Sequence, residues 1–123
     1  MIMLYNFNTD HESDPRIKIK ERIENMDMVA LRISEPFDSP ESEKAELDGC
    51  HGALIYYGHA DPKWYLVRQS LLLKAQNIKS RAVFVDEPNP DKKISRDILN
   101  KQLIVIKDVT EIIPKLDNFL NNL

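Results

Sequence analysis

Short runs of apolar residues recur along the chain at fairly even spacing, and they predict the strands of a sheet. The runs lie at residues 2–5, 28–33, 53–57, 81–85 and 102–106. The last three are almost continuously apolar and rich in β-branched or aromatic side chains. Such runs are typical of strands that a parallel sheet buries on both faces. We therefore expect five parallel strands, with the strand at residues 53–57 among the central ones.

Signals for the start of helices lie between these runs. An Asp or Ser followed by a proline occurs at Asp14, Ser39 and Asp61. The side chain of such a residue can accept hydrogen bonds from the free N–H groups of the first helical turn, and the proline after it loses no helix bond. Helices are predicted at about residues 15–26, 39–48 and 63–78, the second of them short, mostly solvated and ended by Gly49.

Apolar side chains at helical spacing predict which helix faces are buried. Residues 86–101 lack such spacing and begin with a turn cluster. At most a weak helix is predicted there, around residues 96–101. A last helix is predicted over residues 112–123, with Pro114 in its first turn. The predicted apolar stripe of the helix at 63–78 is Trp64, Val67, Leu71, Ala75 and Ile78, widened by Leu66, Leu72 and Leu73. That of the last helix is Ile112, Ile113, Leu116, Phe119, Leu120 and Leu123.

The alternation of strands and helices predicts the fold class. Strands that alternate with helices form a parallel sheet whose right-handed crossovers place helices on both faces. For five strands in 123 residues, we predict a three-layer, flavodoxin-like α/β fold with the strand order 2-1-3-4-5. A chain of this length builds one hydrophobic core, so residues 1–123 are expected to form a single domain.

The composition limits the class of partner and the compartment. With 42% hydrophobic residues and a net charge of -3, the chain is neither disordered nor suited to nucleic acid. Cys50 is the only cysteine, which favours a reduced compartment without disulfides. The first residues lack the basic flank and apolar length of a signal peptide, and no stretch reaches the ~20 apolar residues of a membrane helix. We expect a cytoplasmic protein without membrane or nucleic-acid partners.

Polar residues follow the predicted strands, on the rim where ligands bind in such sheets. In a doubly wound sheet, ligands lie outside the carboxyl ends of the strands, where the strand order reverses. Polar residues also end strands in proteins that have no site there, so a structural role stays open for each of them. The rule places a candidate ligand cleft at Asn8, Asp10, Glu35, Tyr57, Gly58, His59 and Glu87.

Known chemistries of such rims match this sequence only in part. The phosphoacceptor site of a receiver domain needs acids after the first strand, an aspartate ending the third and a lysine after the fifth. Asp10 and Lys107 fit this pattern, but the third strand has no carboxylate before Asp61. With three glycines in all, the chain has no glycine-rich nucleotide loop. No spacing of metal ligands occurs, so no metal is predicted, and Cys50 is expected to be a core thiol.

One segment, roughly residues 37–92, resembles a known family. It is similar to bacterial TIR-like domains, especially those attached to STAND-type ATPases and conflict-system proteins. The resemblance implies a flavodoxin-like fold, and TIR domains act either by associating with one another or by hydrolysing NAD. The residues that carry it are Phe37, Asp38, residues 41–61 with the core phrase Asp48-Gly49-Cys50-His51-Gly52, Trp64, the leucine-rich residues 71–74, and residues 81–85.

The same resemblance bears on catalysis. Catalytic TIR domains carry a glutamate four residues after a tryptophan, in a Ser-x-x-Trp-x-x-x-Glu pattern. Trp64 matches the tryptophan, but Asp61 stands at the serine position and Arg68 at the glutamate position. A guanidinium neither stabilises the oxocarbenium-like charge of the reaction nor accepts a ribose proton, so we predict no catalytic residue and no cofactor. As a family landmark Trp64 would line the cleft; as the first apolar residue of its helix it would pack in the core, which we favour.

The resemblance also implies how the chain acts. The loop Glu35, Pro36, Phe37 and Asp38 occupies the place through which TIR domains often assemble, and Phe37 either anchors an interface or packs on the helix that follows. The expected partners are a second copy or another TIR-like domain, with a fused ATPase module in a longer protein. We therefore expect a signalling domain of bacterial defence that works by association. Two alternatives stay open: an NAD hydrolase whose acid is relocated to Glu35 or Glu87, and a degenerate receiver-like domain.

Overall fold

A parallel sheet forms the centre of the computed structural model, which describes residues 2–6, 14–25, 31–33, 39–94, 97–98 and 101–123. Its strands hydrogen-bond in the order β2-β1-β3-β4-β7, and every neighbouring pair is parallel. β3 lies between β1 and β4, as expected for the strand at residues 53–57. The strands are β1 (Ile2–Asn6), β2 (Leu31–Ile33), β3 (Gly52–Tyr57), β4 (Ser80–Val85) and β7 (Ile104–Ile106).

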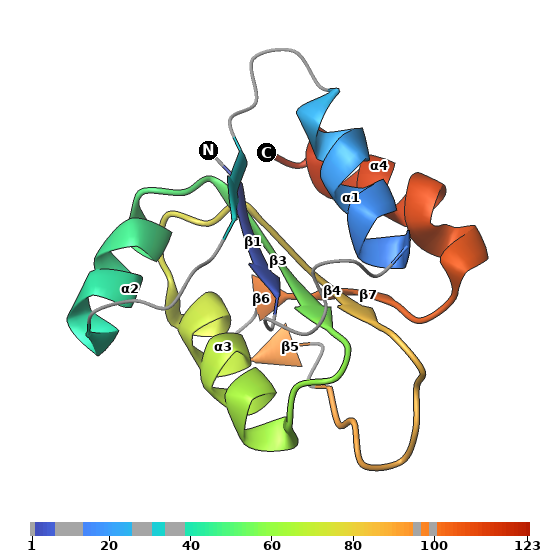
Figure 1. Cartoon of the computed structure of the whole chain (residues 1–123). Helices are drawn as coiled ribbons and strands as arrows, with labels where there is room; N and C mark the ends of the chain where they lie inside the picture. The colour runs from blue at the N-terminus through green and yellow to red at the C-terminus, as the bar shows by residue number, and fades with distance from the viewer. Residues whose placement is uncertain (1, 7–13, 26–30, 34–38, 95–96, 99–100) are drawn as a thin grey trace.

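Helices cover both faces of this sheet (Figure 1). α1 (Asp14–Glu24) and α4 (Ile112–Asn121) lie side by side on one face, and α2 (Pro40–Asp48) and α3 (Pro62–Lys74) lie on the other. A short 3-10 helix (Val109–Glu111) leads into α4. The predicted α/β class, with a parallel sheet and helices, is confirmed.

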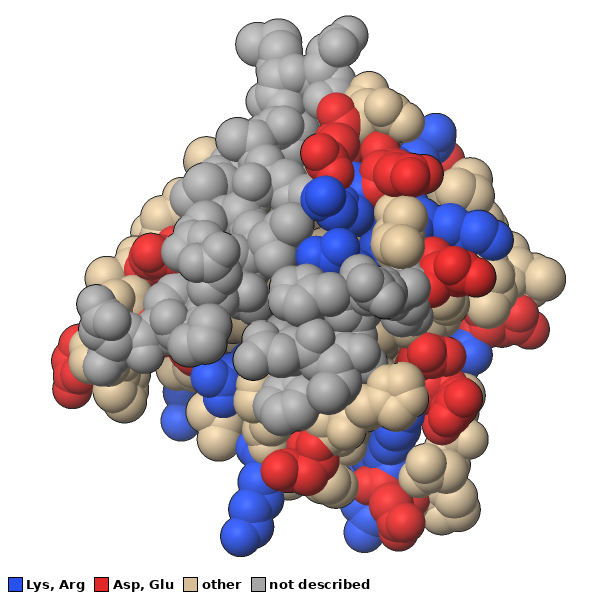
Figure 2. Space-filling model, in the orientation of Figure 1, with Lys and Arg blue, Asp and Glu red and all other residues tan. Residues whose placement is uncertain are grey.

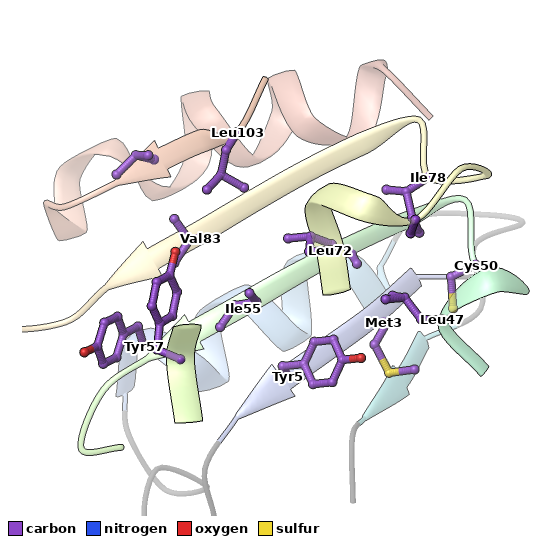
Figure 3. Packing of buried hydrophobic residues seen from close by; sticks show 14 of the residues in the cluster. Met3, Tyr5, Leu47, Cys50, Ile55, Tyr57, Leu72, Ile78, Val83 and Leu103 are labelled. Atoms are coloured by element: carbon purple, nitrogen blue, oxygen red, sulfur yellow. The ribbon is translucent and has the colours of Figure 1, made fainter. Parts of the chain in front are cut away.

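Each face of the sheet has its own hydrophobic cluster. The α1/α4 cluster includes Ile19 and Ile23 of α1, Phe119 of α4, and Leu54 and Phe84 of the sheet. The α2/α3 cluster is lined by Met3, Tyr5, Leu47, Cys50, Ile55, Tyr57, Tyr65, Leu72, Ile78, Val83 and Leu103, among others, most of which are seen together in Figure 3.

Two of the predicted helix starts are confirmed in atomic detail. The hydroxyl of Ser39 accepts a hydrogen bond of 3.1 Å from the backbone N–H of Ser42 and so caps α2. The carboxylate of Asp61 accepts one of 2.9 Å from the backbone N–H of Trp64 and so caps α3. Gly49 follows α2 at its C-cap position, as predicted.

The predicted buried stripe of α3 is confirmed in part. Leu72, Leu73, Ala75 and Ile78 are buried, and Trp64 and Leu71 pack against the α2/α3 cluster. Leu66 and Val67, however, are 49% and 52% exposed, and Tyr65 and Gln69 are buried in their place. Residues 65, 69 and 72 step by four and three, and Gln69 is tolerated on this face because its amide oxygen accepts a hydrogen bond of 2.7 Å from the Tyr65 hydroxyl. Because Gln69 is polar, the pattern of apolar residues did not indicate that residues 65, 69 and 72 share the buried face.

α3 also ends earlier than predicted, at Lys74 instead of about residue 78. Arg81, at the start of β4, is only 7% exposed and explains this end. Its guanidinium donates hydrogen bonds of 2.9 Å to the carbonyl of Leu72 and 2.7 Å to that of Ala75. These carbonyls belong to the last turn, where no further helical N–H can pair with them, so the buried arginine takes the place of another helical turn.

The weak helix predicted around residues 96–101 is not found in the described part of that stretch. Two short strands, β5 (Asp97–Ile98) and β6 (Lys101–Gln102), pair antiparallel there instead. Strands of two residues are too short to give a periodic pattern in the sequence.

The last helix agrees with the prediction except at one position. Pro114 lies in the first turn of α4, and Ile112, Leu116, Phe119 and Leu120 are buried, but Ile113 is half exposed. α4 approaches the sheet closely at Gly52, where a Cβ atom would lie 2.4 Å from the Leu123 side chain and 3.1 Å from the Phe119 ring. A glycine at the start of β3 therefore lets the end of the chain pack onto the sheet.

Candidate functional site

The described candidate residues lie around the end of β3 and the start of α3. Tyr57 and Gly58 are buried, His59 is exposed, and Trp64 is half-buried and packs against the α2/α3 cluster. Glu87 is exposed after β4 and has a φ of 50°, a left-handed conformation that costs energy for a residue with a side chain. The remaining predicted site residues, Asn8, Asp10, Glu35, Pro36, Phe37 and Asp38, lie outside the described residues.

Trp64 has the core-packing role that we favoured, because it packs against the α2/α3 cluster, and it also contacts a charged side chain. The guanidinium carbon of Arg68 lies 5.3 Å from the centre of the Trp64 ring. At this distance a guanidinium is attracted to the face of the indole. Trp64 and Arg68 stand one helical turn apart, so α3 itself sets this contact.

Arg68 is fixed from the other side by an acid of α2. Its Nη2 atom lies 2.7 Å from Oε1 of Glu43, and the Glu43 side chain is only 6% exposed. The Arg68 side chain is 21% exposed, so the pair lies mostly below the surface. A buried carboxylate needs such a partner, because an unpaired buried charge is strongly unfavourable. The ion pair therefore ties α2 to α3 across 25 residues of sequence.

A buried hydroxyl belongs to the same neighbourhood. Tyr5 of β1 is 1% exposed, and its hydroxyl has no hydrogen-bond partner among the described residues. Burial raises the pKa of this hydroxyl above its ordinary value, and the charge of Glu43 raises it further, whereas Arg68 opposes them. Figure 3 shows the Tyr5 ring beside Met3 and Leu47 in the α2/α3 cluster. The charges of Glu43 and Arg68 thus act on a buried hydroxyl of the α2/α3 cluster.

A second group of side chains surrounds Tyr57 on the other flank of α3. The rings of Tyr57 and Tyr65 stack with centroids 4.2 Å apart and planes 5° apart. Burial raises the pKa of Tyr57, and the charges of Asp61 and Asp91 raise it further. The ammonium of Lys92 lies 5.1 Å from the centre of the Tyr57 ring and donates a hydrogen bond to the carbonyl of Asp86. Tyr57 is therefore covered on this flank by the segment that follows β4.

Several of these residues were missed by the sequence-based prediction. Glu43 lay in a helix predicted to be mostly solvated, and only its spacing of four from Leu47 on α2 could have indicated a buried face. Tyr65 and Gln69 fell outside the predicted stripe of α3, although their spacing of four fits a buried tyrosine with a polar partner. The partners that come from distant elements left no local signal.

The cysteine and the described histidines have ordinary structural roles or surface positions. Cys50 is 1% exposed and its thiol donates a hydrogen bond to the carbonyl of Glu46, as expected of a core thiol. His51 and His59 are exposed. Within the described ranges, no three His, Cys, Asp or Glu side chains lie close enough to share a metal ion.

Charged side chains of both signs lie on the described surface (Figure 2). In Figure 2 acidic and basic side chains are interspersed over the part of that face that the structure describes. No helix among the described residues is long and apolar enough to cross a membrane.

Comparison with known proteins finds no family model, no curated protein and no solved structure that matches this chain. The functional assignment therefore depends on the residues themselves.

Proposed function

We propose that this chain is a cytoplasmic TIR-like interaction domain, which associates with a second copy or with another TIR-like domain and does not hydrolyse NAD. The proposal includes a flavodoxin-like fold of the TIR type with the strand order 2-1-3-4-5. The hydrogen-bonded order β2-β1-β3-β4-β7, with helices on both faces, supports this part of the proposal.

The observation that carries the proposal is the ion pair between Arg68 and Glu43. The resemblance to TIR domains places Arg68 where a catalytic member has its acid, and Arg68 is held there by Glu43 at 2.7 Å. A ligand at Trp64 would therefore meet a cation at this position. Glu43 itself is 6% exposed and already paired, so its carboxylate is not available to act on a bound nucleotide. A buried, fully paired carboxylate is typical of a structural ion pair, whereas an acid–base catalyst needs a carboxylate that can reach the substrate.

An exposed apolar surface on α3 supports the association part of the proposal. Leu66 and Val67 are neighbours in sequence and are 49% and 52% exposed. Single exposed apolar residues are common on monomers, but an adjacent pair on one helix face can form the centre of an interface. Phe37 of the loop predicted to be an interface lies outside the described residues.

Sedimentation velocity over a range of protein concentrations tests association. We expect the wild-type chain to form dimers or larger species as concentration rises, and we expect Val67→Lys to reduce this because a lysine would have to be desolvated in the interface. Ile113→Lys on α4 is the matched control, since Ile113 is 50% exposed on the opposite side of the sheet. A wild-type chain that stays monomeric at every concentration, or two variants that behave alike, contradicts this interface.

A second pair of measurements tests the loop. If the loop is part of the interface, Phe37→Ala should lower association and leave the melting temperature nearly unchanged, because truncating an interface anchor commonly costs ~2 kcal/mol of binding. If Phe37 packs on α2, the same change should lower the melting temperature and leave association unaltered. The second result would exclude the loop from the interface.

The alternative of an NAD hydrolase requires an acid elsewhere on the rim. Glu87 is the described candidate, because it is exposed directly after β4 at the carboxyl end of the sheet. Release of nicotinamide from NAD, and its loss in Glu87→Ala or Glu35→Ala, would favour this alternative over the proposed function.

A further inference from the structure

A pocket of about 470 Å³ opens beside the end of β3, the first turns of α3 and the segment after β4. Its size lies within the about 300–1,000 Å³ that is usual for small-molecule sites. Tyr57, one of the predicted cleft residues, lines it, but neither Trp64 nor Arg68 does. Its lining residues are Tyr57, Pro62, Tyr65, Leu66, Asp91 and Lys93.

The inner wall of the pocket is aromatic and held in place. The stacked rings of Tyr57 and Tyr65 are both almost fully buried, and the Tyr65 hydroxyl donates a hydrogen bond of 2.7 Å to Gln69. Pro62 and Leu66 of α3 add exposed apolar surface beside them. The apolar surface that a ligand can reach is therefore that of Pro62 and Leu66, beside the buried rings.

The rim of the pocket carries one charge of each sign. Asp91 and Lys93 are exposed and stand two residues apart, and neither side chain forms an ion pair with another residue that the structure describes. Lys92 between them is already engaged by the Asp86 carbonyl and the Tyr57 ring. The backbone of the segment is fixed as well, since the N–H of Asp91 donates to the Asn89 side chain at 2.9 Å.

We propose that this pocket binds a small zwitterion with an apolar side chain, the chemical class of the aromatic and large aliphatic α-amino acids. The ammonium of such a ligand would face Asp91, its carboxylate would face Lys93, and its side chain would lie against Pro62 and Leu66. A purely apolar ligand would form an ion pair with neither Asp91 nor Lys93. A ligand with one charge would pair with only one of them. Leu66 belongs both to this pocket and to the proposed interface, but the inference does not depend on the proposed interaction function, because its polar contacts are with Asp91 and Lys93.

Nuclear magnetic resonance titration of the isotope-labelled full chain tests the pocket. The probes are L-phenylalanine, 2-phenylethylamine, which lacks the carboxylate, and 3-phenylpropionate, which lacks the ammonium. We expect L-phenylalanine to shift the backbone signals of Tyr57, Leu66 and Lys93. Each of the other two probes should bind up to about fivefold more weakly, because an ion pair at an exposed rim contributes up to that factor. Failure of L-phenylalanine to shift these signals at the limit of its solubility overturns the proposal.

Charge-removing variants then assign each end of the ligand. Asp91→Asn should weaken L-phenylalanine and 2-phenylethylamine by a few fold and leave 3-phenylpropionate unchanged. Lys93→Gln should weaken L-phenylalanine and 3-phenylpropionate and leave 2-phenylethylamine unchanged. Lys107→Gln, an exposed lysine after β7, is the control and should change none of the three affinities.

Two further results would contradict the proposal. Equal affinities of the three probes would show that only the apolar group binds, and a zwitterion site would be excluded. Shifts of the Tyr57 and Lys93 signals on raising the concentration of the Val67→Lys variant without any probe would show instead that a second copy of the chain occupies the pocket. These results are independent of the sedimentation behaviour of Val67→Lys, so failure of the pocket and failure of the interface can be distinguished.

Discussion

The two faces of the sheet differ in the chemistry that they bury. The α1/α4 side buries Arg16 of α1 beside its apolar cluster, and the Tyr56 hydroxyl donates a hydrogen bond of 2.7 Å to Asp86. The α2/α3 side holds a Tyr5 hydroxyl with no partner among the described residues, the Glu43–Arg68 ion pair and the buried guanidinium of Arg81. Both sides thus bury an arginine, but the Glu43–Arg68 pair is mostly buried, whereas the side chains of the Arg22–Asp117 pair between α1 and α4 are 41% and 39% exposed.

This difference indicates that the two sides of the sheet have different roles. Apolar packing stabilises a domain without specifying a site, whereas buried charges and unpaired polar groups are costly and concentrate where function or precise positioning requires them. The pocket beside Tyr57 and the exposed pair Leu66–Val67 lie on the same side as the charges. We therefore expect the α1/α4 side to contribute mainly stability, and the α2/α3 side to carry the functional surface.

The largest expected effect comes from creating a cavity in the α1/α4 cluster. Phe119→Ala should lower the free energy of unfolding by about 3–5 kcal/mol, because Phe119 is fully buried and packs where α4 meets Gly52. Urea unfolding followed by circular dichroism measures this loss. The control Ile113→Ala removes a half-exposed side chain from the same helix and should stay within about 0.5 kcal/mol of the wild type. Similar losses in both variants would contradict the assigned packing of α4.

A smaller loss of stability is expected for a substitution of Arg81 on the α2/α3 side. Arg81→Ala should cost about 2–3 kcal/mol, because the carbonyls of Leu72 and Ala75 would lose a buried, charged donor. Arg81→Lys should recover only part of the loss, since an ammonium does not reproduce the two-pronged geometry of a guanidinium. The same urea experiment applies, with the exposed neighbour Lys79→Ala as control. Full rescue by lysine would show that the charge alone matters.

One matched substitution on the two faces should have opposite effects. Tyr56→Phe removes a hydroxyl that is hydrogen-bonded to Asp86, so it should lower the free energy of unfolding by about 1 kcal/mol. Tyr5→Phe removes a buried hydroxyl that has no described partner, so it should leave stability unchanged or raise it by up to about 1 kcal/mol. A loss in Tyr5→Phe as large as that in Tyr56→Phe would mean that the Tyr5 hydroxyl has a partner, such as bound water.

Alkaline pH should act through the tyrosines of the α2/α3 face. Burial raises the pKa values of Tyr5, Tyr57 and Tyr65 above the ordinary value of 10.0. Above that value the unfolded chain loses protons that the folded chain keeps, so stability falls as pH rises. Each such tyrosine lowers the free energy of unfolding by up to about 1.4 kcal/mol for each pH unit above that value. Urea unfolding at pH 8, 10 and 11 should show a smaller decline in Tyr5→Phe than in the wild type.

Local patterns of residues predicted much of the fold. Strands such as 53–57 and 81–85 are apolar throughout because both of their faces are buried, and the caps at Ser39 and Asp61 act on residues three positions away. Such features depend only on neighbours in sequence. The α/β class and several helix starts were therefore accessible without a structure.

The candidate site was predicted only in part because its contacts join distant segments. Glu43 meets Arg68 across 25 residues, and Arg81 takes the place of a turn of α3 only once β4 has been placed beside β3. The pocket at Tyr57 likewise needs Asp91 and Lys93 from a segment that the sequence marks only as a turn cluster. Asn8, Asp10 and the loop at residues 35–38 stay predictions, since they lie outside the described residues.

The most direct test of the central claim is an assay of nicotinamide release from NAD by the purified chain. The account predicts no release above the rate in buffer, because Arg68 stands at the catalytic position of the resemblance and is held by Glu43. Turnover above that rate, abolished by Glu87→Ala or Glu35→Ala, would contradict the account and identify the chain as a hydrolase with a relocated acid.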